Sequence, residues 1–158
     1  MVSPAEWGPN AWMLLHGLAE RVGNQPNLTT IRDEQNEIRF TLKDFWALLP
    51  CKTCQLHYKE WVRKNPPDIF ASKNGGYLQE DMRLWVYNLH NEVNSRREIN
   101  VAFPESSLEE TYGTVDLRKS AFELKSVYQR GVQTGVLKPE DWKRAWKHLD
   151  LLLRFIGV

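Results

Sequence analysis

The sequence predicts an all-α fold within one domain. Nearly every long segment repeats apolar residues at three-to-four spacing, and stretches in which β-branched residues alternate with polar ones are scarce. The 158 residues match the length of one domain and suffice to bury a substantial core. With 42% hydrophobic and 26% charged residues, the composition is that of a globular protein and excludes a disordered or fibrous chain.

Charge and cysteine content narrow the class of protein further. The 21 basic and 20 acidic side chains leave a net charge of +1, so we expect no nucleic acid and no membrane among the partners. Two cysteines are too few for a disulfide-rich secreted scaffold, the N-terminus lacks the apolar segment of a signal peptide, and no apolar run reaches transmembrane length. These observations predict a soluble, cytoplasmic protein.

Two helices are expected before the cysteines. Pro9 suits a first helical position, and an apolar stripe follows it until Gly23 ends the first helix. A second helix is expected over residues 34–49, where apolar residues recur at helical spacing up to Pro50.

The third helix opens with the two cysteines. The sequence Cys51-Lys-Thr-Cys54 directly follows a proline, and apolar residues at helical spacing continue until Pro66 ends the helix. A loop rich in proline and glycine extends to residue 76, and a fourth helix is expected over residues 77–97.

Three further helices are expected near the C-terminus. Ser107-Leu-Glu-Glu110 has the pattern of a capping box, which predicts the start of a short helix. Amphipathic helices are expected near residues 116–134 and 139–156. Their apolar stripes fit either packing on the preceding helices or a subunit contact.

The spacing of the cysteines indicates redox chemistry. Two cysteines placed at random would seldom lie three residues apart. As a structural disulfide, such a short loop would contribute only about 2 kcal/mol. At a helix N-terminus, however, free N–H groups and the positive end of the helix dipole favour a thiolate, which is the species that attacks disulfides.

Three other interpretations of the cysteine pair remain open. A thioredoxin-like site needs strands around the motif, whereas the pattern predicts helices on both sides. A non-catalytic interaction module with a zinc site is the main alternative, because Cys51, Cys54 and His57 have ligand spacing and His16 or His90 offers a fourth donor. The third interpretation is a pair of inert thiols without a chemical role.

Polar and aromatic residues on two helices indicate a ligand. Trp12 and His16 are four residues apart and share one helix face. His90, Asn91 and Asn94 place several hydrogen-bonding side chains on a helix whose opposite stripe is apolar. Burying such groups costs stability unless they meet a polar ligand, and a nucleotide would be one.

Three motifs follow one another along the chain: Trp7-Gly8-Pro9-x-x-Trp12-x-x-Leu15-His16, Pro50-Cys51-x-x-Cys54 and Trp85-x-x-x-Leu89-His90-Asn91-x-Val93-Asn94. Their order and spacing resemble the ERV/ALR family of FAD-linked sulfhydryl oxidases, and look most like the short forms encoded by large DNA viruses. The resemblance implies a four-helix bundle with a short fifth helix over residues 1–112. Residues 113–158 would form a helical extension, packed on this core or at a subunit interface.

The resemblance also implies an FAD pocket with the flavin ring against the cysteines. Trp12 and His16 would line the flavin, and His90, Asn91 and Asn94 would contact the adenosine half. The other implied pocket residues are Gly8, His57, Tyr58, Trp85, Tyr87 and Val93. Family members often carry a basic residue near the FAD phosphates; the corresponding Ile99 is not basic, and Arg96 and Arg97 are the candidates to replace it.

The two cysteines receive separate roles from the resemblance. Cys54 would lie against the flavin, and Cys51 would be attacked by the thiols of a protein dithiol, with electrons passing through FAD to O2 to give H2O2. The chain has no further cysteine, so clients would reach Cys51 directly or through a separate thiol carrier protein. Family members are commonly homodimers, and a viral member would act in the host cytoplasm or the virion.

Overall fold

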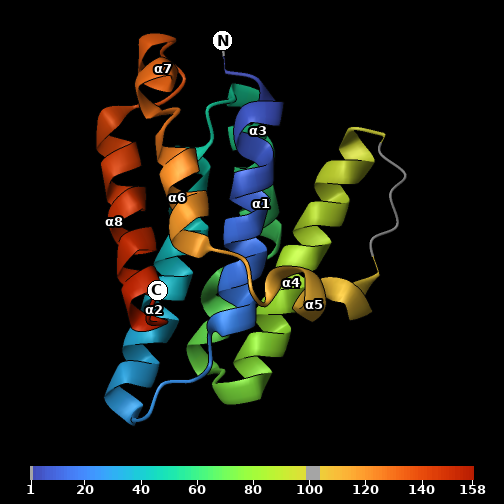
Figure 1. The fold of residues 1–158 in the computed structure, drawn as a ribbon, viewed down its shortest axis with the longest axis vertical. Helices are drawn as coiled ribbons and strands as arrows, with labels where there is room; N and C mark the ends of the chain where they lie inside the picture. Colours follow the sequence, from blue (N-terminus) through green and yellow to red (C-terminus); the bar gives the residue numbers. More distant parts are fainter. Residues whose placement is uncertain (1, 99–103) are drawn as a thin grey trace.

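Eight α-helices and three short 3-10 helices make up the part of the chain that the computed structural model describes, residues 2–98 and 104–158 (Figure 1). In chain order they are α1 (Pro4–Arg21), α2 (Leu28–Asp44), η1 (Phe45–Leu48), α3 (Lys52–Lys64), η2 (Pro67–Ser72), α4 (Gly75–Arg96), η3 (Glu105–Ser107), α5 (Leu108–Tyr112), α6 (Leu117–Lys125), α7 (Tyr128–Gln133) and α8 (Pro139–Phe155). No strand occurs among these residues, so the predicted all-α class is confirmed. Ile99, at the position where the family resemblance leads one to expect a basic residue, lies outside the described residues.

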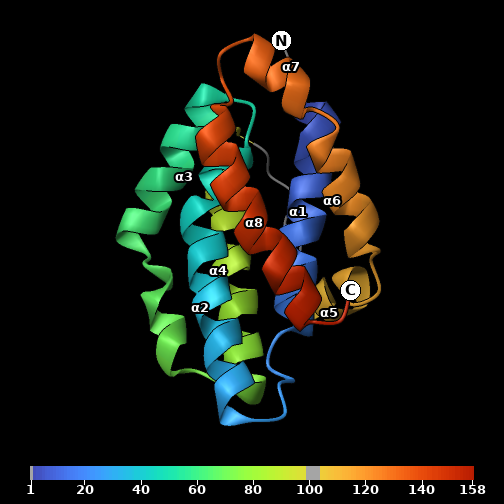
Figure 2. The same cartoon turned by 90° about the vertical axis from the view of Figure 1, so that its left-hand side faces the viewer.

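The first four α-helices form a bundle that the C-terminal helices cover on one side. In Figure 1, α1 lies at the centre with α4 inclined against it, and α6 and α8 lie on the other side of α1. Figure 2 shows α8 crossing in front of α2 and α6 running beside α1. None of the helices in the described ranges is both long and apolar enough to cross a membrane.

The start of α1 corrects the prediction for Pro9. Ser3 caps the helix and forms a capping box with Glu6, while Pro4 takes the first-turn position where a missing N–H costs nothing. Pro9 therefore lies inside the helix rather than at its first position. The local signal was ambiguous because two prolines stand close together and only one can open the helix.

The second helix was also misplaced, because the predicted range of 34–49 begins and ends later than the observed helix. Asn27 accepts a hydrogen bond from the backbone N–H of Thr30 and starts α2 at Leu28. The helix ends at Asp44, and the next four residues tighten into η1, which buries Phe45 against the core. Core packing thus decides a change of helix type that apolar spacing does not reveal.

Two predictions near the C-terminus are wrong in detail. Ser107 makes no capping hydrogen bond through its side chain, because a turn of 3-10 helix already precedes α5. The single helix predicted over residues 116–134 is two helices, α6 and α7, separated by a turn after Lys125. The helix predicted over residues 139–156 is confirmed within one residue as α8.

The apolar stripes of α6 and α8 pack on the bundle. The buried side chains of these two helices include Leu117, Ala121 and Leu124 from α6 and Trp142, Ala145, Leu149, Leu152 and Leu153 from α8. They join the same hydrophobic cluster as the residues of α1 and α2. The extension therefore shares its core with the bundle. Each fully buried leucine contributes about 1.5–3 kcal/mol to the stability of the fold.

A glycine joins the α1–α2 connection to the start of α4. Gly23 has a φ of 90°, and a Cβ at this position would lie 2.2 Å from the carbonyl oxygen of Gly75. Its backbone N–H donates to a carboxylate oxygen of Glu34 at 3.0 Å. Both the left-handed backbone and the close approach require glycine.

We predict that Gly23→Ala lowers the free energy of unfolding by about 2–4 kcal/mol, because it combines left-handed strain with a backbone clash. Gly135→Ala is the matched control: its φ is 77°, but a Cβ there would meet nothing within 4 Å. The control should lose only about 1–2 kcal/mol. Urea unfolding measures both, and equal losses would contradict the close approach at Gly23.

Candidate functional site

The two cysteines form a disulfide at the start of α3, with their Cα atoms 5.2 Å apart. Cys51 is the capping residue of the helix, and its Sγ accepts a hydrogen bond from the backbone N–H of Cys54 at 3.2 Å. The prediction that the cysteines open a helix is therefore confirmed. Both side chains are partly exposed, so the disulfide is accessible from solvent.

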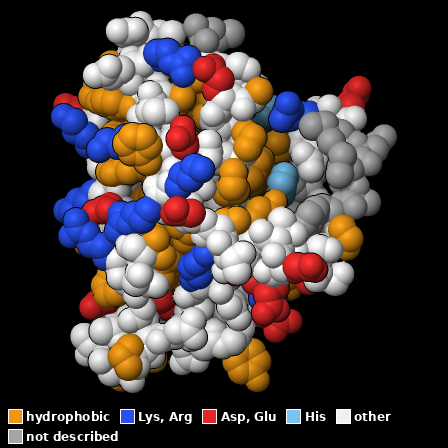
Figure 3. Space-filling view, viewed as in Figure 1, with side chains coloured by type: hydrophobic (Ala, Val, Ile, Leu, Met, Phe, Trp, Pro, Cys, Tyr) orange, Lys and Arg blue, Asp and Glu red, His pale blue; other side chains and the backbone are white. Residues whose placement is uncertain are grey.

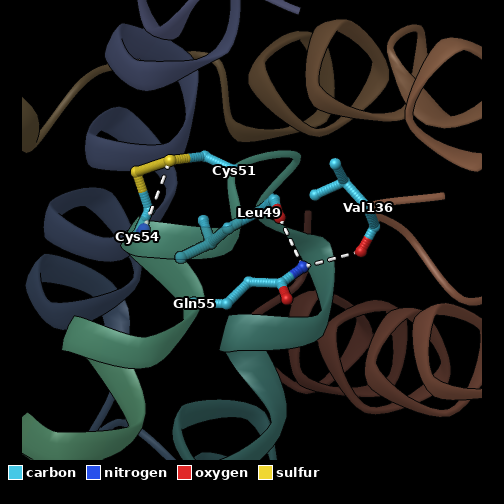
Figure 4. The surroundings of a disulfide bond; sticks show 5 residues. All are labelled: Leu49, Cys51, Cys54, Gln55 and Val136. Atoms are coloured by element: carbon cyan, nitrogen blue, oxygen red, sulfur yellow. Dashed lines mark hydrogen bonds between the residues drawn. A yellow bond between two sulfur atoms is a disulfide. The ribbon is translucent and has the colours of Figure 1, made fainter. Parts of the chain in front are cut away.

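A glutamine holds the backbone around the disulfide (Figure 4). Gln55 lies one turn into α3, and its side-chain amide donates to the carbonyl of Leu49 at 2.8 Å and to that of Val136 at 3.1 Å. The first carbonyl precedes the cysteines, and the second belongs to the loop between α7 and α8. The C-terminal extension therefore contacts the helix that begins with the two cysteines.

Below the disulfide, Tyr58 anchors α3 to α2. Its hydroxyl is buried and donates to the carbonyl of Leu42 at 2.5 Å. Burial raises the pKa of Tyr58 well above its usual value, with a smaller contribution from the nearby charge of Asp44. The neutral hydroxyl thus keeps its proton for this hydrogen bond.

A cavity of about 370 Å³ lies beside the disulfide, between α1, α3 and α4. Its lining comes from the three helices and η1, and consists of Pro4, Trp7, Gly8, Ala11, Trp12, Leu15, Phe45, Leu49, Cys51, Thr53, Cys54, His57, Tyr58, Leu89, Val93, Arg96 and Arg97. Most of these side chains are apolar, and Figure 3 shows hydrophobic side chains gathered beside a histidine between α1 and α4. Both cysteines open onto this cavity.

An aromatic stack continues from the cavity wall into the bundle. The rings of Trp12 and His90 stack with centroids 3.9 Å apart. His16 Nε2 and His90 Nδ1 are 2.8 Å apart and share a hydrogen bond, and the ring of His16 stacks on Tyr112. Burial, with a smaller contribution from the charge of His90, lowers the pKa of His16 to about 3, and burial lowers that of His90 to about 4. The pair is therefore neutral at neutral pH.

The predicted pocket residues divide into two groups. Seven line the cavity: Gly8, Trp12, Cys51, Cys54, His57, Tyr58 and Val93. The other six do not line it: His16, Trp85, Tyr87, His90, Asn91 and Asn94. Of these, His16 and His90 adjoin the wall through Trp12, and Asn91 is exposed on α4.

Trp85 belongs to the core behind the cavity. Its indole N–H donates to the carbonyl of Asn65 at 2.9 Å, and its ring meets Tyr58, Trp61 and Phe70 edge to face. A tryptophan at helical spacing is compatible with core and pocket alike, and only the packing of α4 against η2 places this one inside.

Three further residues of the cavity lining bear on ligand binding, although the sequence did not assign them to the pocket wall. Trp7 lines the cavity, and its buried indole N–H has no acceptor in the described part of the chain. Arg96 and Arg97, considered only for phosphates, lie at the same cavity. Arg96 pairs with Glu92 at 3.0 Å, whereas Arg97 makes no ion pair within the described residues. The Trp7-Gly8-Pro9 motif was the sequence signal that could have assigned Trp7 to the cavity wall.

The zinc interpretation has no ligand set in the described ranges. No group of three or more His, Cys, Asp or Glu side chains there is placed to hold a metal ion, and the two cysteines are bonded to each other. A cysteine pair at the end of an aromatic cavity instead defines a helical thiol-redox protein.

A family model described as the Erv1 / Alr family matches residues 9–113, about two thirds of the chain, and the chain belongs to this family. Among curated proteins it is 24% identical to the FAD-linked sulfhydryl oxidase ERV1 of Arabidopsis thaliana, over 78% of this chain and 58% of that protein. It is 32% identical to an FAD-linked sulfhydryl oxidase of African swine fever virus, over 57% of this chain and 66% of that protein.

A third relative is also viral. The chain is 36% identical to a putative FAD-linked sulfhydryl oxidase of Frog virus 3, over 59% of this chain and 57% of that protein. The chain thus spans between about half and two thirds of the length of these relatives. No solved structure matches it significantly.

Acid should destabilise the protein through His16. Its pKa is 6.5 in an unfolded chain and about 3 in the fold, so the unfolded state binds more protons as pH falls below 6.5. We expect the free energy of unfolding to fall by about 2 kcal/mol from this residue between pH 6.5 and 5. Urea unfolding at the two pH values measures it.

His16→Gln should weaken this pH dependence without abolishing it, because His90, whose pKa burial also lowers, remains; the variant also lowers stability at neutral pH by removing the bond to His90. His148→Gln is the control, because that histidine contacts Glu37 on the far side of α2 and leaves His16 in place. An unchanged pH dependence in His16→Gln would contradict the assignment.

Proposed function

We propose that this chain is an FAD-dependent sulfhydryl oxidase that forms disulfides in protein dithiols. The observation that carries the proposal is the Cys51–Cys54 disulfide at the start of α3, which opens onto an aromatic cavity. Membership of the Erv1/Alr family supports it, as do relatives named FAD-linked sulfhydryl oxidases.

The cavity suits the flavin half of FAD. Its volume of about 370 Å³ lies within the range of small-molecule sites, and its lining is largely aromatic and aliphatic. Trp7 offers a buried indole N–H that meets no acceptor among residues 2–98 and 104–158, and a Cβ on Gly8 would meet nothing within 4 Å, so a ligand has room to approach the backbone there. Arg96 and Arg97 offer the positive charge that the pyrophosphate requires.

We keep the remaining predicted contacts as part of the proposal. Trp12 lies in the cavity wall and would contact the flavin, with His16 behind it. His90 stacks on Trp12 and shares α4 with Asn91 and Asn94, which supports this end of α4 as the site of the adenosine half.

Thiol–disulfide exchange is the chemistry that the chain itself performs. A client thiolate attacks Sγ of Cys51, the bond between the two cysteines breaks, and Cys54 leaves as a thiolate. A second client thiolate attacks the client sulfur of this mixed disulfide, so the client disulfide forms and Cys51 leaves as a thiolate. Two electrons then reside on the cysteine pair. The cavity beside Cys54 would hold FAD, which would supply the two-electron acceptor for re-forming the Cys51–Cys54 disulfide, with O2 as the final oxidant that becomes H2O2.

The first turn of α3 favours both leaving groups. The N–H of Cys54 already donates to Sγ of Cys51, and this bond becomes stronger when that sulfur is negatively charged. The positive end of the helix dipole acts on both sulfurs. Because a stabilised thiolate leaves faster, this position promotes both exchange steps.

The visible spectrum of the purified protein tests the proposal. We expect a flavin absorption band that bleaches when dithiothreitol is added and recovers as oxygen is consumed. Cys51→Ser and Cys54→Ser should keep the band but lose oxygen uptake by about 100-fold or more, because each removes an obligatory sulfur.

Trp61→Phe is a suitable control, since this partly buried residue packs edge to face on Trp85, does not line the cavity, and its indole N–H has no partner in the described residues. It should keep both the band and the activity. Colourless protein, or cysteine variants as active as the unmodified chain, would refute the proposed function.

The extension and the cellular setting complete the proposal. We propose that residues 1–112 form the catalytic core and that residues 113–158 cover α1 and α2; the family match, which ends at residue 113, supports this division. Clients would be protein dithiols that reach Cys51 directly or through a thiol carrier protein. The viral relatives support action in a host cytoplasm or a virion.

The homodimer stays a prediction, and the mass of the protein in solution tests it. Because α6 and α8 already cover α1 and α2, a second subunit would have to use other faces of the bundle. Light scattering after size-exclusion chromatography should give twice the chain mass of 18.5 kDa. A mass equal to that of one chain would contradict the prediction.

A further inference from the structure

A second hollow, of about 410 Å³, lies on the other side of α3 from the FAD cavity. Its walls are the solvent side of α3, the η1 segment and the loop that joins α7 to α8. We call it the lysine groove, after Lys52, Lys59 and Lys138, which line it. The loop belongs to the extension beyond residue 113, where the family match ends.

The groove and the cavity use opposite faces of one helix. Lys52, Leu56 and Lys59 recur at three-to-four spacing on α3 and line the groove, whereas Cys54 and His57 line the cavity. Lys52 directly follows Cys51 in the chain. A segment bound along the groove would therefore end beside the sulfur that incoming thiols attack.

The charge of the groove is positive. Within the described residues, none of its three lysines makes an ion pair, whereas Asp141, the one acidic residue in its lining, pairs with Arg144 at 3.3 Å. Its positive charge therefore stands without a local counterion. In a protein with a net charge of only +1, such a local excess is a feature of this surface rather than of the whole chain.

The floor of the groove offers apolar contacts. Leu56 is 65% exposed although it lies between two lysines on the helix. The ring of Trp46 also lines the groove, with the ammonium of Lys59 3.7 Å from its centroid. From Lys52 to Lys59 the helix rises about 10 Å, which is the length of three extended residues.

The opposite wall is fixed to the helix. Gln55 donates to the carbonyl of Val136, and both residues line the groove. Figure 4 shows this bond beside the disulfide. The two walls are thus fixed relative to each other and to the helix that Cys51 caps, which is the condition for presenting a bound segment to that sulfur.

We propose that the lysine groove docks an acidic segment of the client protein next to the cysteine to be oxidised. Aspartate or glutamate side chains of the client would pair with the three lysines, and one apolar client side chain would cover Leu56. The proposal rests on the proposed oxidase activity and adds the chemical class of its client. Docking positions the thiol and adds no redox step.

Oxygen uptake with peptide dithiols tests the proposal in the full-length, FAD-loaded protein. Two peptides share one cysteine pair, which is preceded in one by glutamates and in the other by lysines. At low salt we expect a KM about tenfold lower for the acidic peptide, and this difference should shrink as salt is added. Dithiothreitol serves as the small thiol that needs no docking.

The double substitution Lys59→Glu and Lys138→Glu should raise the KM for the acidic peptide about tenfold and leave dithiothreitol oxidation unchanged. The matched control, Lys119→Glu with Lys147→Glu, makes the same charge change at exposed lysines outside the groove and should leave the KM nearly unchanged.

Equal KM values for the two peptides, or an equal effect of the control pair, would overturn the docking proposal while leaving the oxidase intact. Absence of dithiothreitol oxidation in the unsubstituted protein would instead refute the oxidase, and the docking proposal with it.

Discussion

The hydrogen bond from the backbone N–H of Cys54 to Sγ of Cys51 is the contact on which the site depends. It makes a cysteine the cap of α3, and so it places both sulfurs where the helix dipole is positive. Both cysteines line the cavity, and Lys52, which directly follows Cys51, lines the lysine groove. In the proposed oxidase, redox chemistry, ligand access and client access would therefore share one helix start.

The rest of the fold holds this helix start in place. Tyr58 fixes α3 to α2 through a buried hydroxyl, and Gln55 joins it to the segment before the cysteines and to the C-terminal extension. Because α8 in turn packs along α2, the extension supports the same helices that carry the site. The extension, which lies outside the family match, thus helps to hold the helix that carries the cysteines.

The aromatic wall beside the cavity buries two histidines, and burying polar groups costs stability unless they are hydrogen-bonded. His16 and His90 are held neutral and bonded to each other between Trp12 and Tyr112. A neutral histidine pair satisfies its own hydrogen bond without bringing a charge into the bundle. The aromatic wall therefore carries no charge, which suits a flat apolar ring as its ligand.

Local sequence signals were sufficient to predict structure where the residue types allow only one local conformation. Apolar spacing predicted the helical class, and the position of Cys51-x-x-Cys54 after Pro50 predicted a redox pair at a helix start. The same signals failed where two answers were locally equivalent. Pro4 and Pro9 both suit a first turn, and the apolar run up to Leu49 fits an α-helix as well as the 3-10 turn that ends it.

The sequence by itself determined the helical class, the position of the cysteine pair at a helix start and the family, because each depends on residues close together in the chain or on motifs in a fixed order. Only the tertiary structure decided that Trp85 supports the core while Trp7 lines the cavity, since helical spacing is the same for a wall and a core residue. It alone brought Val136 to Gln55, because that contact spans 81 residues and depends on how α8 packs.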